Sequence, residues 1–159
     1  MNSSVVVRLP IRHAELHVLL DLLERSRDAI ARGNDVMGNA RVLLTALRSI
    51  HDELASAAVA FADGLDEDED AEQWVYFAVS ARAALDRAEK SGARSLGREL
   101  EMLDESFDHL REAVLLLEPE DYKEALAATP PNPDRWWGER ARLDAGLREI
   151  DLERVLSVL

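Results

Sequence analysis

A stripe of large apolar residues between positions 96 and 117 constrains the fold of this chain more than any other feature. Its members are separated alternately by four and three residues: Leu96, Leu100, Leu103, Phe107, Leu110, Val114 and Leu117. This spacing holds the side chains on one face of an α-helix, as in a helix that packs into a bundle or pairs with another helix. The stripe predicts one continuous amphipathic helix with one buried face.

Three earlier segments show the same helical periodicity, which predicts an all-α fold. The first predicted helix follows Pro10, a residue that the opening turn of a helix tolerates. The second runs from Met37 to Phe61, and the third from about residue 69 to residue 90. The breaks between the helices contain glycines, which readily end helices: Gly33, Gly64 and Gly92. Because short connections make neighbouring helices antiparallel, the sequence predicts an up-down-up-down four-helix bundle.

The 159 residues fit a single domain. Residues 1–9 include VVVRL, the only strand-like piece, and are predicted to form an N-terminal arm along the bundle. Residues 10–118 then form the four-helix core, and residues 119–159 form an additional helical segment packed on it. In that C-terminal segment, Asp134 is predicted to cap a last helix that begins at residue 135.

Trp136 and Trp137 are adjacent in that last predicted helix. Adjacent helical residues point about 100° apart, so both indoles cannot sit squarely on one buried face. Trp136 shares a stripe with Leu143, Leu147 and Ile150 and is predicted to anchor the helix on the bundle. Trp137 is then expected at the boundary, where an exposed indole would mark a surface for a partner protein.

The net charge of -13 is concentrated in two segments. Residues 63–72 contain seven acidic residues and no basic one, and residues 99–124 contain ten acidic residues against two basic ones. A field of this sign repels nucleic acid and anionic membranes and attracts basic proteins. The charge therefore argues against nucleic-acid and membrane binding and favours a basic protein partner.

The first acidic segment does not fit a calcium-binding loop. An EF-hand loop that starts at Asp66 needs glycine at its sixth position and glutamate at its twelfth. This chain has Ala71 and Phe77 there. The run is interpreted as a solvated connection whose carboxylates offset the positive end of the next helix.

The second acidic segment places carboxylates along one side of the predicted fourth helix, away from the leucine stripe. This acidic ridge consists of Glu101, Asp104, Glu105, Asp108 and Glu112. Opposed charges accelerate association and favour the matching partner. The ridge, together with Trp137, indicates a non-enzymatic protein-interaction module, such as an immunity-protein-like or antitoxin-like inhibitor, or an escort, of a basic protein.

Three histidines suggest an alternative function. In an antiparallel bundle, His17, His51 and His109 would lie at a similar height, and Glu105 stands one turn before His109. Imidazoles and carboxylates can form a metal site with a carrier or enzymatic role. However, the Glu-x-x-His pairs typical of di-iron bundles are missing. A third interpretation is a structural homodimer with part of a leucine stripe at its seam.

The chain has no cysteine, and no apolar run approaches the ~20 residues that span a bilayer. The three valines before Arg8 are too few for the apolar centre of a signal peptide. The sequence therefore predicts a cytoplasmic protein without disulfides, and no residue pattern calls for a cofactor or assigns a catalytic residue.

Overall fold

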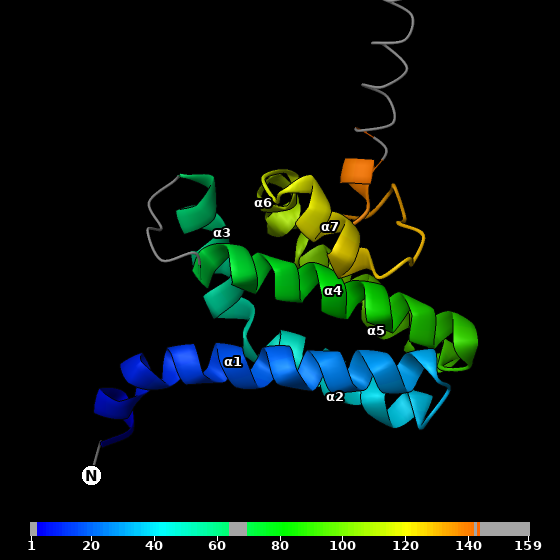
Figure 1. Cartoon of the computed structure of the whole chain (residues 1–159), viewed down its shortest axis with the longest axis horizontal. Coiled ribbons are helices and arrows are strands. Elements are labelled where there is room, and N and C mark those ends of the chain that lie inside the picture. Colours follow the sequence, from blue (N-terminus) through cyan, green and yellow to red (C-terminus); the bar gives the residue numbers. More distant parts are fainter. Residues whose placement is uncertain (1–2, 64–69, 142, 144–159) are drawn as a thin grey trace, which may run out of the picture.

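The structure of the protein, a computed structural model, describes residues 3–63, 70–141 and 143. All the regular secondary structure in these ranges is helical, which confirms the all-α class (Figure 1). The helices and the short 3-10 turns (η) are α1 (Ser3–Ala31), α2 (Val36–Ser49), α3 (His51–Ala62), α4 (Asp70–Ser91), η1 (Arg94–Leu96), α5 (Gly97–Ser106), η2 (Asp108–Leu110), α6 (Arg111–Leu115) and α7 (Pro119–Leu126).

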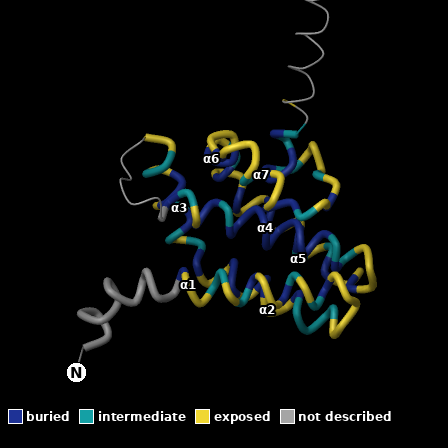
Figure 2. Tube along the Cα trace, in the orientation of Figure 1, coloured by how far each residue is buried: buried dark blue, intermediate teal, exposed yellow. Residues whose placement is uncertain are grey.

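Helix α4 lies at the centre of the molecule, and α1, α2, α3 and α7 all pack against it. Residues 77–86 of α4 are buried without interruption, so this helix has no solvent face along its middle (Figure 2). Alanines at 78, 81, 83 and 84 let neighbouring helices approach from several sides. Since α4 is surrounded on all sides, the regular up-down-up-down four-helix bundle is not confirmed.

Two of the predicted helices are interrupted. The helix expected over 37–61 breaks at Ile50, whose φ of -107° and ψ of 18° lie outside the helical region. The Ser49 hydroxyl donates a 2.8 Å hydrogen bond to the Ala46 carbonyl there, a local bond that competes with the helical ladder. The helix expected over 96–117 breaks at Phe107 and continues through η2 into α6. Every member of the 96–117 stripe is nevertheless buried, so its buried face is confirmed and its continuity is wrong.

The N-terminal piece is helical within the described residues, in contrast to its strand-like sequence, and its packing along the bundle as an arm stays a prediction. Residues 3–9 continue α1 through Pro10 and are not extended. Valine disfavours a helix by only about 0.5 kcal/mol per residue, and no strand is present in the described ranges to pair with this piece. The residue types alone therefore gave too strong an indication of extended structure.

After α7 the chain turns back over α4 and α5 without forming the helix predicted from residue 135. Asp134 is not a helix cap. Instead, the Asn132 side chain accepts a 3.0 Å hydrogen bond from the Asp134 N–H, and residues 133–138 form turns and a bend before a helix begins at 139. The turn is tight, because a Cβ atom on Gly138 would lie 2.1 Å from the Asn132 carbonyl oxygen.

Two predicted features lie outside the described residues. They are most of the first acidic run, at 64–69, and the end of the C-terminal extension, at 144–159. Asp66 and the positions chosen for the calcium comparison up to residue 69 fall in the first of these ranges.

Candidate functional site

Four members of the acidic ridge are exposed, and one is not. Glu101, Glu105, Asp108 and Glu112 lie at the surface, as predicted. Asp104 is only 4% exposed and points into the protein, so its assignment to the exposed ridge is wrong. The reason is its position four residues after the buried Leu100, which makes the two side chains neighbours on the helix.

Asp104 instead forms a buried ion pair with Arg82 of α4. The Arg82 Nε and Nη2 atoms donate to Oδ1 and Oδ2 of Asp104 at 2.8 and 2.9 Å, and the two side chains are 5% and 3% exposed. The Trp136 indole Nε1 donates a third hydrogen bond of 2.9 Å to Oδ1, and Arg135 Nε lies 3.6 Å from Oδ2. A charge buried this deeply is tolerated only when it is paired and hydrogen-bonded.

Trp137 completes this buried cluster and is not exposed. Its side chain is fully buried, and the Arg82 Cζ atom lies 5.2 Å from the centroid of its ring. The aromatic face therefore contacts a guanidinium whose Nη1 has no hydrogen-bond partner among the described residues. The prediction of a boundary Trp137 is wrong because it assumed helical geometry, whereas both tryptophans lie in a turn and can point inward together. We call Arg82, Asp104, Trp136 and Trp137 the Arg82 cluster.

A cavity of about 420 Å³ opens beside the Arg82 cluster, between α4, α5 and the proline-rich segment 130–133. Two of its cations already have carboxylate partners, since Arg82 pairs with Asp104 and the Lys90 ammonium lies 2.9 Å from Asp86. Among the described residues, no hydroxyl, thiol or imidazole lines it. The cavity therefore presents mainly carboxylates and cations that pair with one another.

The three histidines proposed as metal ligands do not converge. The rings of His51 and His109 are 5.2 Å apart between centroids, with Phe107 against both, and His51 Nε2 lies 3.1 Å from the Ser106 carbonyl oxygen. His17 is exposed on α1. Within the described residues, no group of three or more histidine or carboxylate side chains could hold a metal ion, so Glu105 does not complete such a site either.

The contact between the two histidines has an electrostatic consequence. Burial lowers the pKa of His109, and the nearby charge of His51 lowers it further. Two imidazolium groups in contact repel each other, so the pair favours the state in which His109 is neutral.

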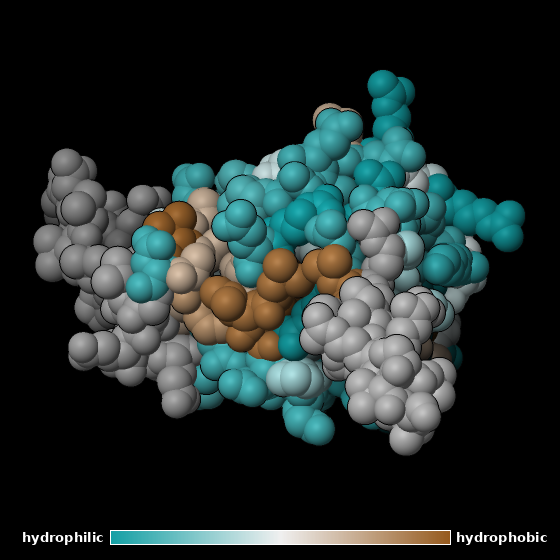
Figure 3. Space-filling view, turned by 90° about the horizontal axis from the view of Figure 1, so that it is seen from above, coloured by the Kyte–Doolittle hydropathy of each residue, from teal (hydrophilic) through white to brown (hydrophobic). Residues whose placement is uncertain are grey.

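The surface also carries an exposed pair of leucines that the sequence patterns did not single out. Leu115 and Leu116, at the end of α6, are 41% and 49% exposed. Figure 3 looks onto the side of the molecule that carries α3, α6 and α7 and shows an apolar patch at its centre, with hydrophilic surface above and below it. The signal was present in VLLL at 114–117, because a helix that buries 114 and 117 turns the two middle residues outward.

Carboxylates without ion-pair partners surround this leucine pair in sequence. Glu112 precedes it by one turn, and Glu118 follows it before α7 begins. Both are exposed, and neither forms an ion pair with any residue that the structure describes. Three further glutamates are likewise exposed and form no ion pair with a described residue: Glu101 and Glu105 of the acidic ridge, and Glu120 of α7.

Arg140 fixes the backbone beneath the leucine pair. Its Nη1 donates to the carbonyl oxygens of Val114, at 3.0 Å in the last turn of α6, and of Leu117, just after that helix. Its Cζ atom lies 4.9 Å from the ring centroid of Tyr122, whose hydroxyl donates a 2.8 Å hydrogen bond to the Trp137 carbonyl. The segment after the tryptophan turn thus supplies the cation that the carbonyl end of α6 favours.

No family model, curated protein or solved structure matches this chain. Among the described residues, no helix is long and apolar enough to cross a membrane.

Proposed function

We propose that this chain is a non-enzymatic protein-interaction module that binds a basic protein through the surface formed by α5, α6 and the start of α7. The observation that carries the proposal is the exposed pair Leu115 and Leu116, flanked by the unpaired carboxylates Glu112 and Glu118. An exposed apolar patch with a polar rim is the usual composition of a protein-binding surface.

The charge distribution supports a basic partner. The exposed ridge residues Glu101 and Glu105 extend the negative surface away from the leucine pair, and the whole chain carries -13. A partner whose apolar contact residues are ringed by lysine and arginine would be attracted over a distance and then held by apolar burial. Inhibition or escort of that partner, as by immunity or antitoxin proteins, is the role that such a surface suits.

A capture experiment tests this proposal. The full chain, Leu115→Ser/Leu116→Ser and Glu112→Lys/Glu118→Lys would each be used to capture proteins from cells that produce it, with quantification by mass spectrometry. The matched control is Glu24→Lys/Asp52→Lys, which makes the same charge change at exposed positions on α1 and α3. We expect one basic protein to bind the wild type and the control but neither test variant, and to bind more weakly as salt rises.

The outcome against the proposal is equally specific. If both test variants and the control retain the same proteins in the same amounts, this surface is not the binding surface. Equilibrium sedimentation addresses the homodimer interpretation, in which two acidic rims would have to meet and repel each other. A stable dimer of the wild type that Leu115→Ser/Leu116→Ser converts to monomer would replace the basic-partner proposal with self-association.

A further inference from the structure

A second cavity, of about 650 Å³, lies between α1, α4 and α7, away from the leucine pair. Most of its lining residues come from one stretch of α1, and α4 and the end of α7 contribute the rest: Asp21, Glu24, Arg25, Arg27, Asp28, Ala31, Arg87 and Ala127. Its volume is in the range of cavities that bind small molecules.

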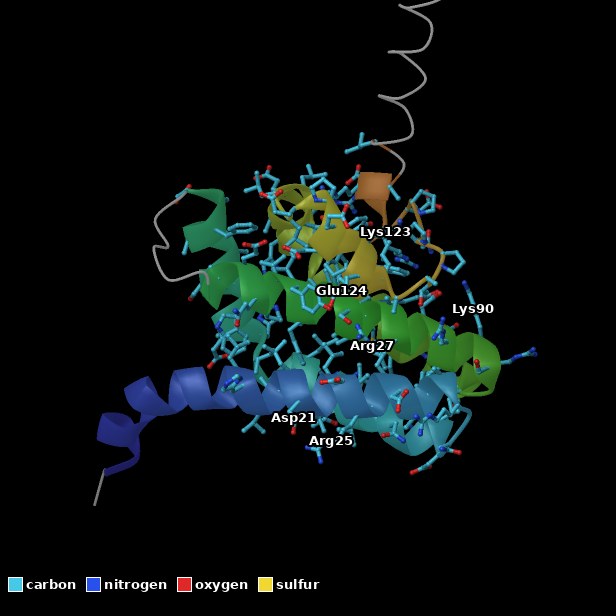
Figure 4. The ribbon with its side chains drawn as sticks, in the orientation of Figure 1. Asp21, Arg25, Arg27, Lys90, Lys123 and Glu124 are labelled. Carbon is cyan, nitrogen blue, oxygen red and sulfur yellow. The ribbon has the colours of Figure 1, made fainter. Side chains whose placement is uncertain are left out.

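Arg27 enters this cavity as a cation without a carboxylate partner. It is half-buried, and its Nη1 donates a 2.8 Å hydrogen bond to the hydroxyl of the fully buried Ser80. It also contacts the Tyr76 hydroxyl, which donates a 3.2 Å hydrogen bond to Glu124. These neighbours orient the guanidinium, but no carboxylate among the described residues forms an ion pair with it. Figure 4 shows Arg27 on the side of α1 that faces α4.

Arg87 of α4 is the second such cation. It is half-buried, and its Nη2 donates a 3.2 Å hydrogen bond to the carbonyl oxygen of Ala127. That carbonyl belongs to a left-handed turn, since Ala127 and Ala128 have φ values of 49° and 65°. Non-glycine residues rarely adopt this conformation, which occurs preferentially where surrounding structure enforces it. The turn therefore holds a neutral carbonyl oxygen against Arg87, which leaves the charge of the guanidinium without a carboxylate partner.

Most carboxylates that line the cavity already have ion-pair partners. Asp21 pairs with Arg25 at 3.1 Å, and Asp28 pairs with Arg32 at 3.2 Å, each one turn along α1. Arg25 lines the cavity as well, so the Asp21–Arg25 pair adds no net charge to it. Glu24 is the one lining carboxylate without an ion pair within the described structure. Two unpaired guanidinium groups therefore share a cavity with one unpaired carboxylate, in a chain whose net charge is -13.

We propose that Arg27 and Arg87 form a binding site for an oxyanion, the phosphate or carboxylate group of a small polar molecule. A guanidinium has five N–H donors. Arg27 directs donors to the Ser80 and Tyr76 hydroxyls, and Arg87 directs one to the Ala127 carbonyl. The remaining donors suit the paired oxygens of a phosphate or carboxylate. The cavity exceeds the size of a bare oxyanion, so the rest of the ligand occupies the polar space toward Glu24. This site is independent of the proposed protein-binding surface.

Titration of the ¹⁵N-labelled full chain at constant ionic strength tests the site. The probes are inorganic phosphate, glycerol 3-phosphate and succinate, with chloride as the balancing anion. We expect saturable shifts of the Nε–Hε signals of Arg27 and Arg87 and of the Ala127 amide. The probe with the strongest binding tells whether phosphate or carboxylate is preferred. Shifts that rise linearly with concentration for all three probes, or none at these groups, would overturn the proposal.

Charge-removing variants supply the specificity control. Arg27→Gln and Arg87→Gln should each weaken binding about tenfold or more, as expected for the loss of a charge-assisted hydrogen bond. Arg48→Gln and Arg98→Gln remove the same charge from exposed arginines on α2 and α5 that do not line this cavity, and they should change affinity less than about threefold. Equal weakening by all four variants would reduce the site to non-specific attraction. If Arg27→Gln fails to fold because Ser80 loses its partner, Arg87→Gln against the two controls decides.

Discussion

Replacement of Asp104 by alanine should destabilise this protein more than any exposed substitution on α5. The change leaves the Arg82 guanidinium charged and without its bidentate partner, although the Arg82 side chain is only 5% exposed. Breaking a buried pair in this way costs about 3–5 kcal/mol. The Trp136 N–H loses its acceptor as well, which costs about 1–3 kcal/mol when no water replaces it.

These costs are large against the stability of a typical domain, about 5–15 kcal/mol. We therefore expect Asp104→Ala to be partly unfolded at room temperature, while Glu105→Ala, an exposed neighbour, should lie within about 0.5 kcal/mol of wild type. Urea unfolding followed by circular dichroism and tryptophan fluorescence measures both. The indole Nε1–H signal of Trp136 should also move in any folded fraction of Asp104→Ala, because it loses a charged acceptor.

A double replacement separates the ion pair from simple packing. Arg82→Met/Asp104→Leu removes both charges and should be more stable than Asp104→Ala by about 2 kcal/mol or more, since no uncompensated charge stays buried. The reasoning is refuted if Asp104→Ala costs no more than Glu105→Ala. It is refuted equally if the double replacement is as damaging as the sum of its two single changes.

Three further outcomes follow from particular backbone and side-chain positions. Gly138→Ala should lower the free energy of unfolding by about 1–3 kcal/mol in urea titrations, because its Cβ would meet the Asn132 carbonyl at 2.1 Å and the turn must shift. Ala128→Gly should raise that free energy by about 0.5 kcal/mol, since glycine relieves the φ of 65° but gains freedom in the unfolded chain. Because the pKa of His109 is lowered in the folded state, the unfolded chain binds its proton first as the pH falls. Its contribution to stability is then complete above the ordinary pKa of 6.5 and is lost as the pH falls through the lowered value. Melting temperatures measured across that range should show this slope for wild type and a shallower slope for His109→Gln.

The sequence was a good guide to burial and a poor one to helix continuity. Alternating spacings of three and four residues identify an inward face, and a 3-10 turn such as η2 keeps that face nearly as well as an α-helix does. The stripe from Leu96 to Leu117 therefore stays buried although Phe107 breaks its helix. The spacing of apolar residues indicates which way side chains point. It does not indicate where local hydrogen bonds end a helix.

The Arg82 cluster could not be predicted from local patterns. Arginine and aspartate side chains are ordinarily exposed. Arg82 and Asp104 can be buried only because they form an ion pair with each other, across a separation of 22 positions in the sequence. Trp137 was misplaced for a related reason, since its orientation depends on the turn that Asn132 and Gly138 form. The sequence did contain one indication of this turn, the segment TPPNPD. Its turn-forming residues favour turns that continue past residue 135, where a helix was expected.

The same C-terminal segment that fills the Arg82 cluster also orders the proposed binding surface. Arg140 holds the carbonyl end of α6, and Glu139 accepts a hydrogen bond from Arg111 at its start. Hydrogen bonds with Glu139 and Asp108 raise the pKa of Arg111, so the guanidinium in this contact stays charged. A short helix held at both ends presents its exposed leucines in a fixed geometry, and a partner then loses less entropy in ordering them. Leu115 and Leu116 are thus exposed on a backbone that buried contacts hold in place, which favours a binding surface over an accidental one.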